Sequence, residues 1–304
     1  KACVDRSVRD AAYDEARDLH LLTVMADDGD PGGEEIFVNL QKWLTEAGQK
    51  LNIEVEMVDV GAPSVSWATY GIPSAPPAVP VVVLTGRRKA TLGGTSFLVD
   101  HWEPGPNKKE LDQLKTSPVR NKIRKAAGRS LAVMVYAPGS DGYDSSVAQV
   151  VDEVARVWSD KTPMGVQVLR IDRTDSAERM LLAFMGVKDT GPPWVGVIFG
   201  RGKLMVPLLG ESITAENLNT QLETLVADCT CLQNVSSLGV DLPMEWDRRD
   251  DAEVLALRTG LRLDGSMPAR TGIPEVVFWT FGGLVFLVGI ASLWIVNRSN
   301  GRPV

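Results

Sequence analysis

Residues 191–203 read GPPWVGVIFGRGK, which places two prolines, an apolar run and a glycine-rich turn in succession. Residues 80–89 read PVVVLTGRRK and repeat that order with a similar turn. Short runs of β-branched and apolar residues bounded by proline and glycine predict buried strands. The presence of the same strand and turn in each half of the chain indicates an internal duplication.

The elements around these two strands also occur in the same order in both halves. Strands are predicted from apolar runs, and helices from apolar residues that recur every three or four positions. In the first half the predicted elements lie at 19–25, 36–51, 53–60, 80–84, 95–99 and from Asn107 onward. In the second half they lie at 130–138, 147–158, 166–172, 176–187, 193–199 and 214–226. Four or five of these elements recur at a near-constant offset of about 112–114 residues, and the short segment 63–73 lies where the first half needs its second helix. Each half is predicted to fold as β-α-β-α-β-β-α.

This order, with a proline just before the third strand, resembles the thioredoxin fold. In thioredoxins that proline follows a cis peptide bond and lies beside the active site. The resemblance implies that Pro193 is this residue in the second half, and that Pro80, or alternatively Pro77, is its equivalent in the first. We therefore expect an α/β chain with two tandem thioredoxin-like domains.

The thiols of catalytic thioredoxins are missing from both halves. The family carries Cys-x-x-Cys between the first strand and the first helix, where the helix dipole lowers the thiol pKa. Here Ser140 to Tyr143 occupy that place in the second half, and the acidic loop 27–35 occupies it in the first. A dithiol–disulfide cycle needs two sulfur atoms, so we predict redox-inactive domains without catalytic residues. The resemblance implies that such domains serve as binding or scaffold modules.

Composition excludes several classes of ligand. The net charge of −7 argues against nucleic acid as a partner. Two histidines and three cysteines do not supply the four closely spaced ligands of a zinc site, so no metal and no cofactor is predicted. The acidic loop does not follow the EF-hand pattern, and its carboxylates are interpreted as complements to a helix dipole.

A predicted transmembrane helix lies near the end of the sequence. Residues 276–296 carry no charge and match the roughly 20 residues that cross a bilayer, and Trp279 and Trp294 lie near the two ends. Three small residues share one face, where a neighbouring helix would approach closely: Gly282, Gly289 and Ser292. The predicted partners are therefore the lipid bilayer and other membrane-protein subunits.

Orientation and disulfide bonding are expectations that depend on export. The start KACVDRS has no initiator Met, which suits a mature protein after removal of a signal peptide. We then expect a single-pass protein of a bacterial inner membrane, with a periplasmic globular part and a cytoplasmic C-terminus; a truncated, cytosolic tail-anchored protein is the alternative. Export would permit one disulfide that joins Cys3 to Cys229 or Cys231, and a redox pair of Cys229 and Cys231 is the rival interpretation.

Between the two domains lies a basic segment that Ser117-Pro118 begins as a helix and Gly128 ends. A solvated helix face is the first interpretation, and docking to an acidic surface or to anionic lipid is the second. The predicted organisation is an N-terminal extension (1–18), a first thioredoxin-like domain (19–116), this basic linker helix (117–129), a second thioredoxin-like domain (130–228), a membrane-proximal linker (229–274), the transmembrane helix (275–297) and a tail (298–304).

These features favour a non-catalytic, membrane-anchored scaffold or accessory subunit of a multi-subunit membrane complex, with an energy-transducing complex as one candidate. Two alternatives are a thiol-redox or assembly factor that uses Cys229 and Cys231, and a chaperone-like binding protein that acts alone.

Overall fold

The structure is a computed structural model, and it describes residues 7–47, 50–62, 65, 67–72, 79–87, 96–140, 145–227, 238–247 and 250–254. All of these residues belong to one compact unit, Lys1–Val254. A second unit, Leu255–Val304, lies outside the described residues, and so does the predicted transmembrane helix with Gly282, Gly289 and Ser292. In the described part of the chain, no helix combines the length and the apolar character needed to span a bilayer.

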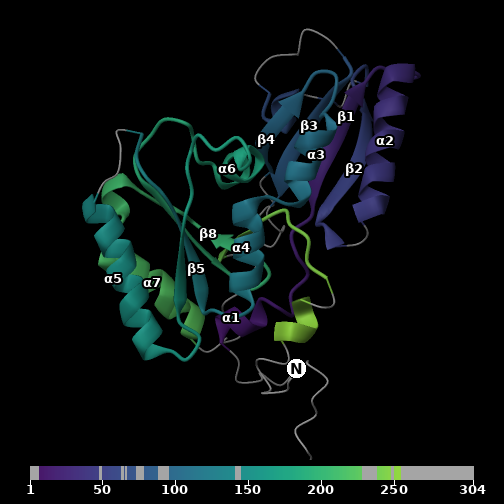
Figure 1. Cartoon of the computed structure of the whole chain (residues 1–304). Coiled ribbons are helices and arrows are strands. Elements are labelled where there is room, and N and C mark those ends of the chain that lie inside the picture. The colour runs from purple at the N-terminus through teal and green to yellow at the C-terminus, as the bar shows by residue number, and fades with distance from the viewer. Residues whose placement is uncertain are drawn as a thin grey trace, which may run out of the picture. The chain divides into compact units, whose positions relative to one another are not determined.

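The first domain contains a sheet whose described strands are ordered β2-β1-β3-β4. Strand β1 is parallel to β2 and antiparallel to β3, and β3 is antiparallel to β4. Two helices, α2 and α3, share an apolar core with one face of this sheet (Figure 1). The elements are β1 (His20–Ala26), α2 (Pro31–Ala47), β2 (Ile53–Asp59), the 3-10 helix η2 (Trp67–Tyr70), β3 (Val81–Arg87), β4 (Ser96–Trp102) and α3 (Lys108–Lys115).

The second domain repeats this arrangement and adds to it. Its path of described strands is β10-β8-β7-β5-β6, and β6-β5-β7-β8 has the order and the strand directions of β2-β1-β3-β4. The predicted α/β chain with two thioredoxin-like sheets is therefore present. The elements are α4 (Pro118–Ala127), β5 (Ala132–Ala137), α5 (Ser145–Lys161), β6 (Val166–Arg170), α6 (Arg179–Met185), β7 (Trp194–Phe199), β8 (Lys203–Met205), β9 (Leu208–Leu209), η4 (Gly210–Ser212), α7 (Ala215–Val226) and β10 (Gly239–Asp241).

Helices cover both faces of the second sheet. The core on one face includes residues of α5 and α7, and the core on the other includes residues of α4 and α6 (Figure 1). Strands β5 and β7 are buried along their whole length. A strand covered on both faces has no solvent side, which is why these two segments are continuous apolar runs rather than alternating ones.

The basic linker helix is an integral part of the second domain. Ser117 caps α4 by accepting a hydrogen bond from the Arg120 backbone, and Pro118 occupies the first turn, as predicted. The helix buries Val119 and Ile123 against the sheet, while Lys122 is exposed. Its basic side is thus the solvated side of an amphipathic helix, and the expectation of a mere linker is corrected.

The segments expected to be an N-terminal extension and a membrane-proximal linker also pack on the second domain. The short helix α1 (Val8–Ala11) places Val8 in the core beside α7. Strand β10 pairs with β8, whose edge would otherwise leave backbone groups without partners. After it, Leu242, Met244 and Trp246 are buried. Residues 7–18 and 238–254 therefore belong to the folded unit, and the roles expected for them from the sequence are corrected.

Candidate functional site

The acidic loop of the first domain forms the start of α2. The Asp30 carboxylate accepts hydrogen bonds from the backbone of Gly32 at 3.2 Å and of Gly33 at 3.0 Å. A side chain on Gly33 would clash, because its Cβ would lie 2.4 Å from the Cβ of Ala26. Among the described residues, no group of three or more acidic, histidine or cysteine side chains is arranged to hold a metal ion. The loop has the structural role of a helix cap.

The corresponding loop of the second domain is closed by hydrogen bonds within the chain. The Ser140 backbone donates to the Gly191 carbonyl at 3.0 Å, and the Gly191 backbone donates to the Ser140 hydroxyl at 3.2 Å. The Arg173 guanidinium donates to three carbonyl oxygens of this region, those of Pro138, Lys188 and Pro192. Burial lowers the pKa of Arg173. The described start of this loop, Pro138 to Ser140, is therefore held by hydrogen bonds to Arg173 and Gly191, whereas residues 141–144 lie outside the described part of the chain.

The two prolines expected beside these loops differ in their peptide bonds. The Val79–Pro80 bond is cis, the isomer expected there, and a Cβ on Gly32 would lie 3.8 Å from the Pro80 ring. Pro193 also lies beside its loop, since a Cβ on Gly139 would lie 3.1 Å from its Cδ. The bond before Pro193 is not cis, which corrects the expectation for the second domain. Its neighbour Pro192 offers its carbonyl to Arg173, and trans is the default isomer when contacts do not oppose it.

Three other predicted residues lie outside the described part of the chain, namely Cys3, Cys229 and Cys231, and so does Pro77. A second cis bond, between Glu103 and Pro104, had no counterpart in the predictions. His101 is exposed.

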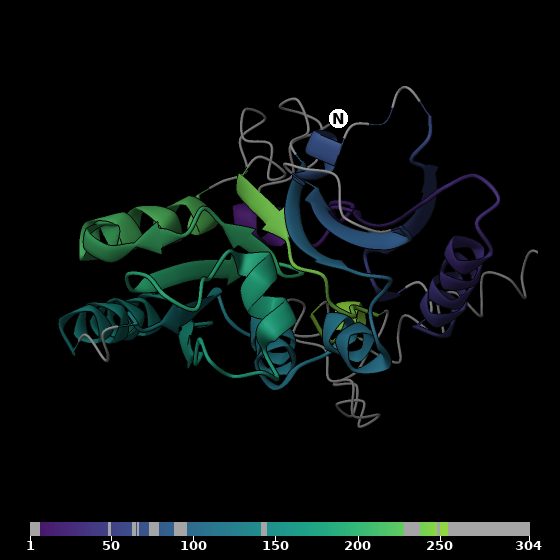
Figure 2. The ribbon, with the colours of Figure 1, turned by 90° about the horizontal axis from the view of Figure 1, so that it is seen from above.

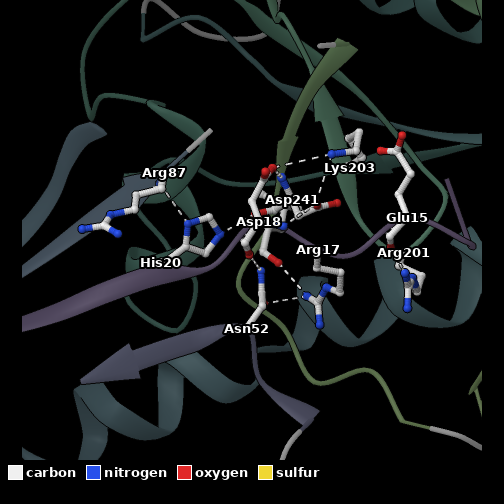
Figure 3. Close-up of polar contacts among 10 residues, drawn as sticks. Glu15, Arg17, Asp18, His20, Asn52, Arg87, Arg201, Lys203 and Asp241 are labelled. Carbon is white, nitrogen blue, oxygen red and sulfur yellow. Dashed lines mark hydrogen bonds and ion pairs between the residues drawn. The ribbon is translucent and has the colours of Figure 1, made fainter. Parts of the chain in front are cut away.

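A group of buried charges lies between the two domains, and the sequence predictions did not include it. Lys203 on β8 places its ammonium 3.0 Å from Asp241 and 3.5 Å from Asp18 (Figure 3). The three side chains are at most 4% exposed. Each carboxylate also accepts a hydrogen bond from the backbone of the other aspartate, at 2.8 and 2.9 Å. One cation and two anions from three distant segments therefore form one interlocked cluster.

Neutral and cationic side chains extend this cluster into the first domain. Asn52 donates to the Asp18 carbonyl at 2.9 Å and accepts a hydrogen bond from Arg17 at 2.7 Å. Arg17 also donates to the Leu242 carbonyl at 2.9 Å. Figure 2 shows β10, in light green, at the edge of the second sheet that faces the first domain, where its Asp241 meets Asp18. Residues 238–254, called the C-terminal segment below, thereby join the two domains.

His20 lies fully buried beside the cluster and is held as a neutral ring. Its Nδ1 accepts a hydrogen bond from the Arg87 backbone at 3.1 Å, so the proton is on Nε2, which donates to the Asp241 carbonyl at 2.7 Å. Burial lowers the pKa of His20 to about 4, and the charges of Arg17 and Lys203 act in the same direction. The hydrogen bond to Asp241 and its negative charge oppose the shift.

Stability should consequently fall as the pH drops from 6.5 towards 4. The unfolded chain binds a proton at His20 near the ordinary pKa of 6.5, whereas the folded chain does so only near 4. The stability that the neutral, buried His20 ring contributes is therefore complete above pH 6.5, and it is lost as the pH falls from 6.5 to about 4. The difference between these two pKa values corresponds to about 3 kcal/mol in the free energy of unfolding. Urea unfolding curves measured from neutral pH to pH 4 will detect this change.

A pair of single variants separates this effect from general acid denaturation. His101→Gln alters an exposed histidine and should retain the full loss of stability. His20→Gln removes the buried ring and should flatten the curve between pH 6.5 and 4. Equal slopes in the two variants would show that another group causes the acid sensitivity.

No protein-family model matches the sequence, and no curated protein matches it. Solved structures with similarity to the chain include the zinc-bound form of human ERp44, with 13% identity, 72% of this chain and 59% of that chain covered, and a TM-score of 0.26. The first two thioredoxin domains of Naumovozyma dairenensis Eps1p show 10% identity, with 77% of this chain and 98% of that chain covered and a TM-score of 0.26.

A third similar structure is the N-terminal domain of alkylhydroperoxide reductase AhpF from Enterococcus faecalis, with 15% identity, 71% of this chain and 94% of that chain covered, and a TM-score of 0.22. The chain thus spans 59% of the length of human ERp44. Its own strand order and strand directions are consistent with two thioredoxin-like domains.

Proposed function

We propose that this chain is a non-catalytic scaffold subunit, anchored in a membrane by residues 275–297, which binds other membrane subunits. The observation that carries the proposal is the state of the two loops that hold thiols in catalytic thioredoxins. Neither the acidic loop 27–35 nor residues 138–146 contain a cysteine. Asp30 and Ser140 are instead engaged in hydrogen bonds within their own domains.

The joint between the domains supports the same proposal. Met180 of α6 belongs to the core of the first domain, and Phe184 of the same helix contacts the rings of His20 and Phe97 at centroid distances of 4.7 and 5.5 Å. Helix α6 also contacts α3 and β4. A chain that must hold partners in a fixed geometry benefits from such a continuous joint, because two freely hinged domains would lose that geometry.

The full chain should not reduce the disulfides of insulin. A reductase needs an accessible dithiol, and the loops that hold it in the family have no sulfur here. The double variant Cys229→Ser, Cys231→Ser should behave like its parent in the same turbidity assay, with an active thioredoxin as the positive control. Reductase activity that disappears in the double variant would support the thiol-redox alternative instead.

The predicted membrane helix should contribute to partner binding through its small residues. Gly282→Leu combined with Gly289→Leu should leave membrane insertion intact but weaken co-purification of partner subunits, because bulky side chains keep helices apart. Leu284→Val is the matched control, since a helix places Leu284 away from that face. Unchanged co-purification of the double variant would assign partner binding to the folded unit and leave the helix as an anchor.

A further inference from the structure

A cleft of about 840 Å³ lies next to the buried cluster, between the two domains. Its walls come from the N-terminal segment, the turn before β2, the turn before β8 and the C-terminal segment after β10. This volume lies within the range of roughly 300–1,000 Å³ found for small-ligand sites. Three basic side chains line it, namely Arg17, Lys50 and Arg201.

Among the described residues, two of these cations have only neutral hydrogen-bond partners. Arg17 donates to the carbonyls of Lys50 and Leu242 and to the Asn52 amide oxygen. Arg201 donates to the backbone carbonyl of Glu15. In the part of the chain that the structure describes, no carboxylate oxygen lies within 4.0 Å of either guanidinium. Both arginines are half-buried, and charges that are withdrawn from water are usually paired, so two such arginines in one cleft are unusual.

The two aspartates of the cleft have other roles. Asp247 forms an ion pair with Lys50 at 3.3 Å and exchanges hydrogen bonds with Asp250 at the start of the last helical turn. Asp251 accepts a hydrogen bond from the Trp246 indole at 2.8 Å. Burial lowers the pKa of Arg17 to about 10; the negative charge of Asp241 opposes this shift, and repulsion from Arg201 adds to it. Among the described residues, carboxylates therefore act on Arg17 only from a distance, and none is in direct contact with either guanidinium.

We propose that this cleft binds a small organic ligand through an oxyanion, a carboxylate or a phosphate, held by Arg17 and Arg201. Both groups match the planar fork of a guanidinium, and a second guanidinium, from the turn between β7 and β8, provides further donors. Leu19, which is 47% exposed, and the buried side chains of Leu51 and Trp246 supply apolar walls for the remainder of the ligand. Binding of such a ligand would connect the N-terminal segment to the β7–β8 turn.

Three probes test the proposal on the full chain in detergent: phenyl phosphate, benzoate and inorganic phosphate, each titrated calorimetrically in a low-chloride buffer. We expect saturable binding of at least one of the first two. Arg201→Gln should weaken it by about tenfold or more, because it removes a charge-assisted hydrogen bond. The matched control Arg156→Gln changes an exposed arginine of α5 and should bind like the parent.

The outcomes identify the chemical class of the ligand and decide whether the proposal holds. Tighter binding of phenyl phosphate assigns the site to phosphate esters, and tighter binding of benzoate assigns it to carboxylates. Arg201 has a single hydrogen bond among the described residues, so its variant should remain folded, and circular dichroism will check this. Absence of saturable binding of all three probes, or equal affinity in a folded Arg201→Gln variant, would overturn the proposal. Neither result bears on the scaffold role, which the reductase and co-purification experiments test.

Discussion

Replacing Lys203 by methionine should lower the free energy of unfolding by about 3–5 kcal/mol, because it leaves two buried carboxylates without their cation. The ammonium lies within 3.5 Å of both Asp18 and Asp241, and neither aspartate is more than 4% exposed. Methionine retains most of the volume of lysine, so the loss measures the electrostatic effect rather than a cavity. Urea unfolding at neutral pH gives the difference directly.

Two further variants make this result interpretable. Arg156→Met breaks exposed ion pairs with Glu153 and Asp160 on α5 and should leave the free energy of unfolding close to that of the parent, because solvent screens exposed pairs. Asp241→Asn added to Lys203→Met should recover part of the loss, because it removes one of the two unpaired charges. A loss below about 1 kcal/mol for Lys203→Met alone would mean that water compensates the carboxylates and that the cluster does not hold the domains together.

Strands β1 to β7 and their order along the chain could be predicted because each has a local signal, whereas no strand was predicted at the positions of β8, β9 and β10. The all-apolar segments that become β5 and β7 are covered on both faces, and the half-buried β2 alternates apolar and acidic residues. Helix boundaries were equally local, since Asn107, Ser117 and Thr214 each cap a helix with their own side chain. Such signals depend on neighbours in the sequence, so they can be read without knowledge of the fold.

The buried cluster could not be predicted, because its members lie far apart in the sequence. Asp18, Lys203 and Asp241 each resemble an ordinary surface charge when considered alone. One signal was available at the C-terminal side: Val240, Leu242, Met244 and Trp246 are apolar at every second position, which is the pattern of an extended segment with one buried side. Residues 238–247 could have been recognised from it as part of the fold rather than as a linker.

Helix α4 shows how composition can mislead. Its four basic residues suggest a charged surface helix, whereas the spacing of Val119, Ile123 and Ala126 defines the buried stripe. Arg120 lies within that stripe, is 1% exposed and donates to the carbonyls of Leu114 and Pro243. Burial lowers its pKa to about 10. A count of charges does not distinguish this arginine from the solvated lysines beside it.

Trp246→Ala should lower the free energy of unfolding by about 3–5 kcal/mol, as expected for the removal of a large core side chain. The indole is 6% exposed, its ring centroid lies 6.1 Å from that of Tyr13, and its Nε1 donates to Asp251. The Trp246 backbone also donates to the Lys50 carbonyl of the first domain at 2.9 Å. The variant should therefore loosen the C-terminal segment from both domains and expose it to proteolysis.

The size of this effect distinguishes a structural segment from a tether. If residues 229–274 were only a connection to the membrane, Trp246→Ala would leave the unfolding midpoint unchanged and alter only the linker. Val206→Ala, which trims a side chain that is 60% exposed, provides the matched control and should cost less than about 0.5 kcal/mol. Trp246→Phe should lose about 1 kcal/mol, since it keeps the ring in the core but removes the hydrogen bond to Asp251. We expect the loss in the free energy of unfolding to be largest for Trp246→Ala, smaller for Trp246→Phe and smallest for Val206→Ala. This order is expected only if residues 238–254 complete the core between α4 and β10.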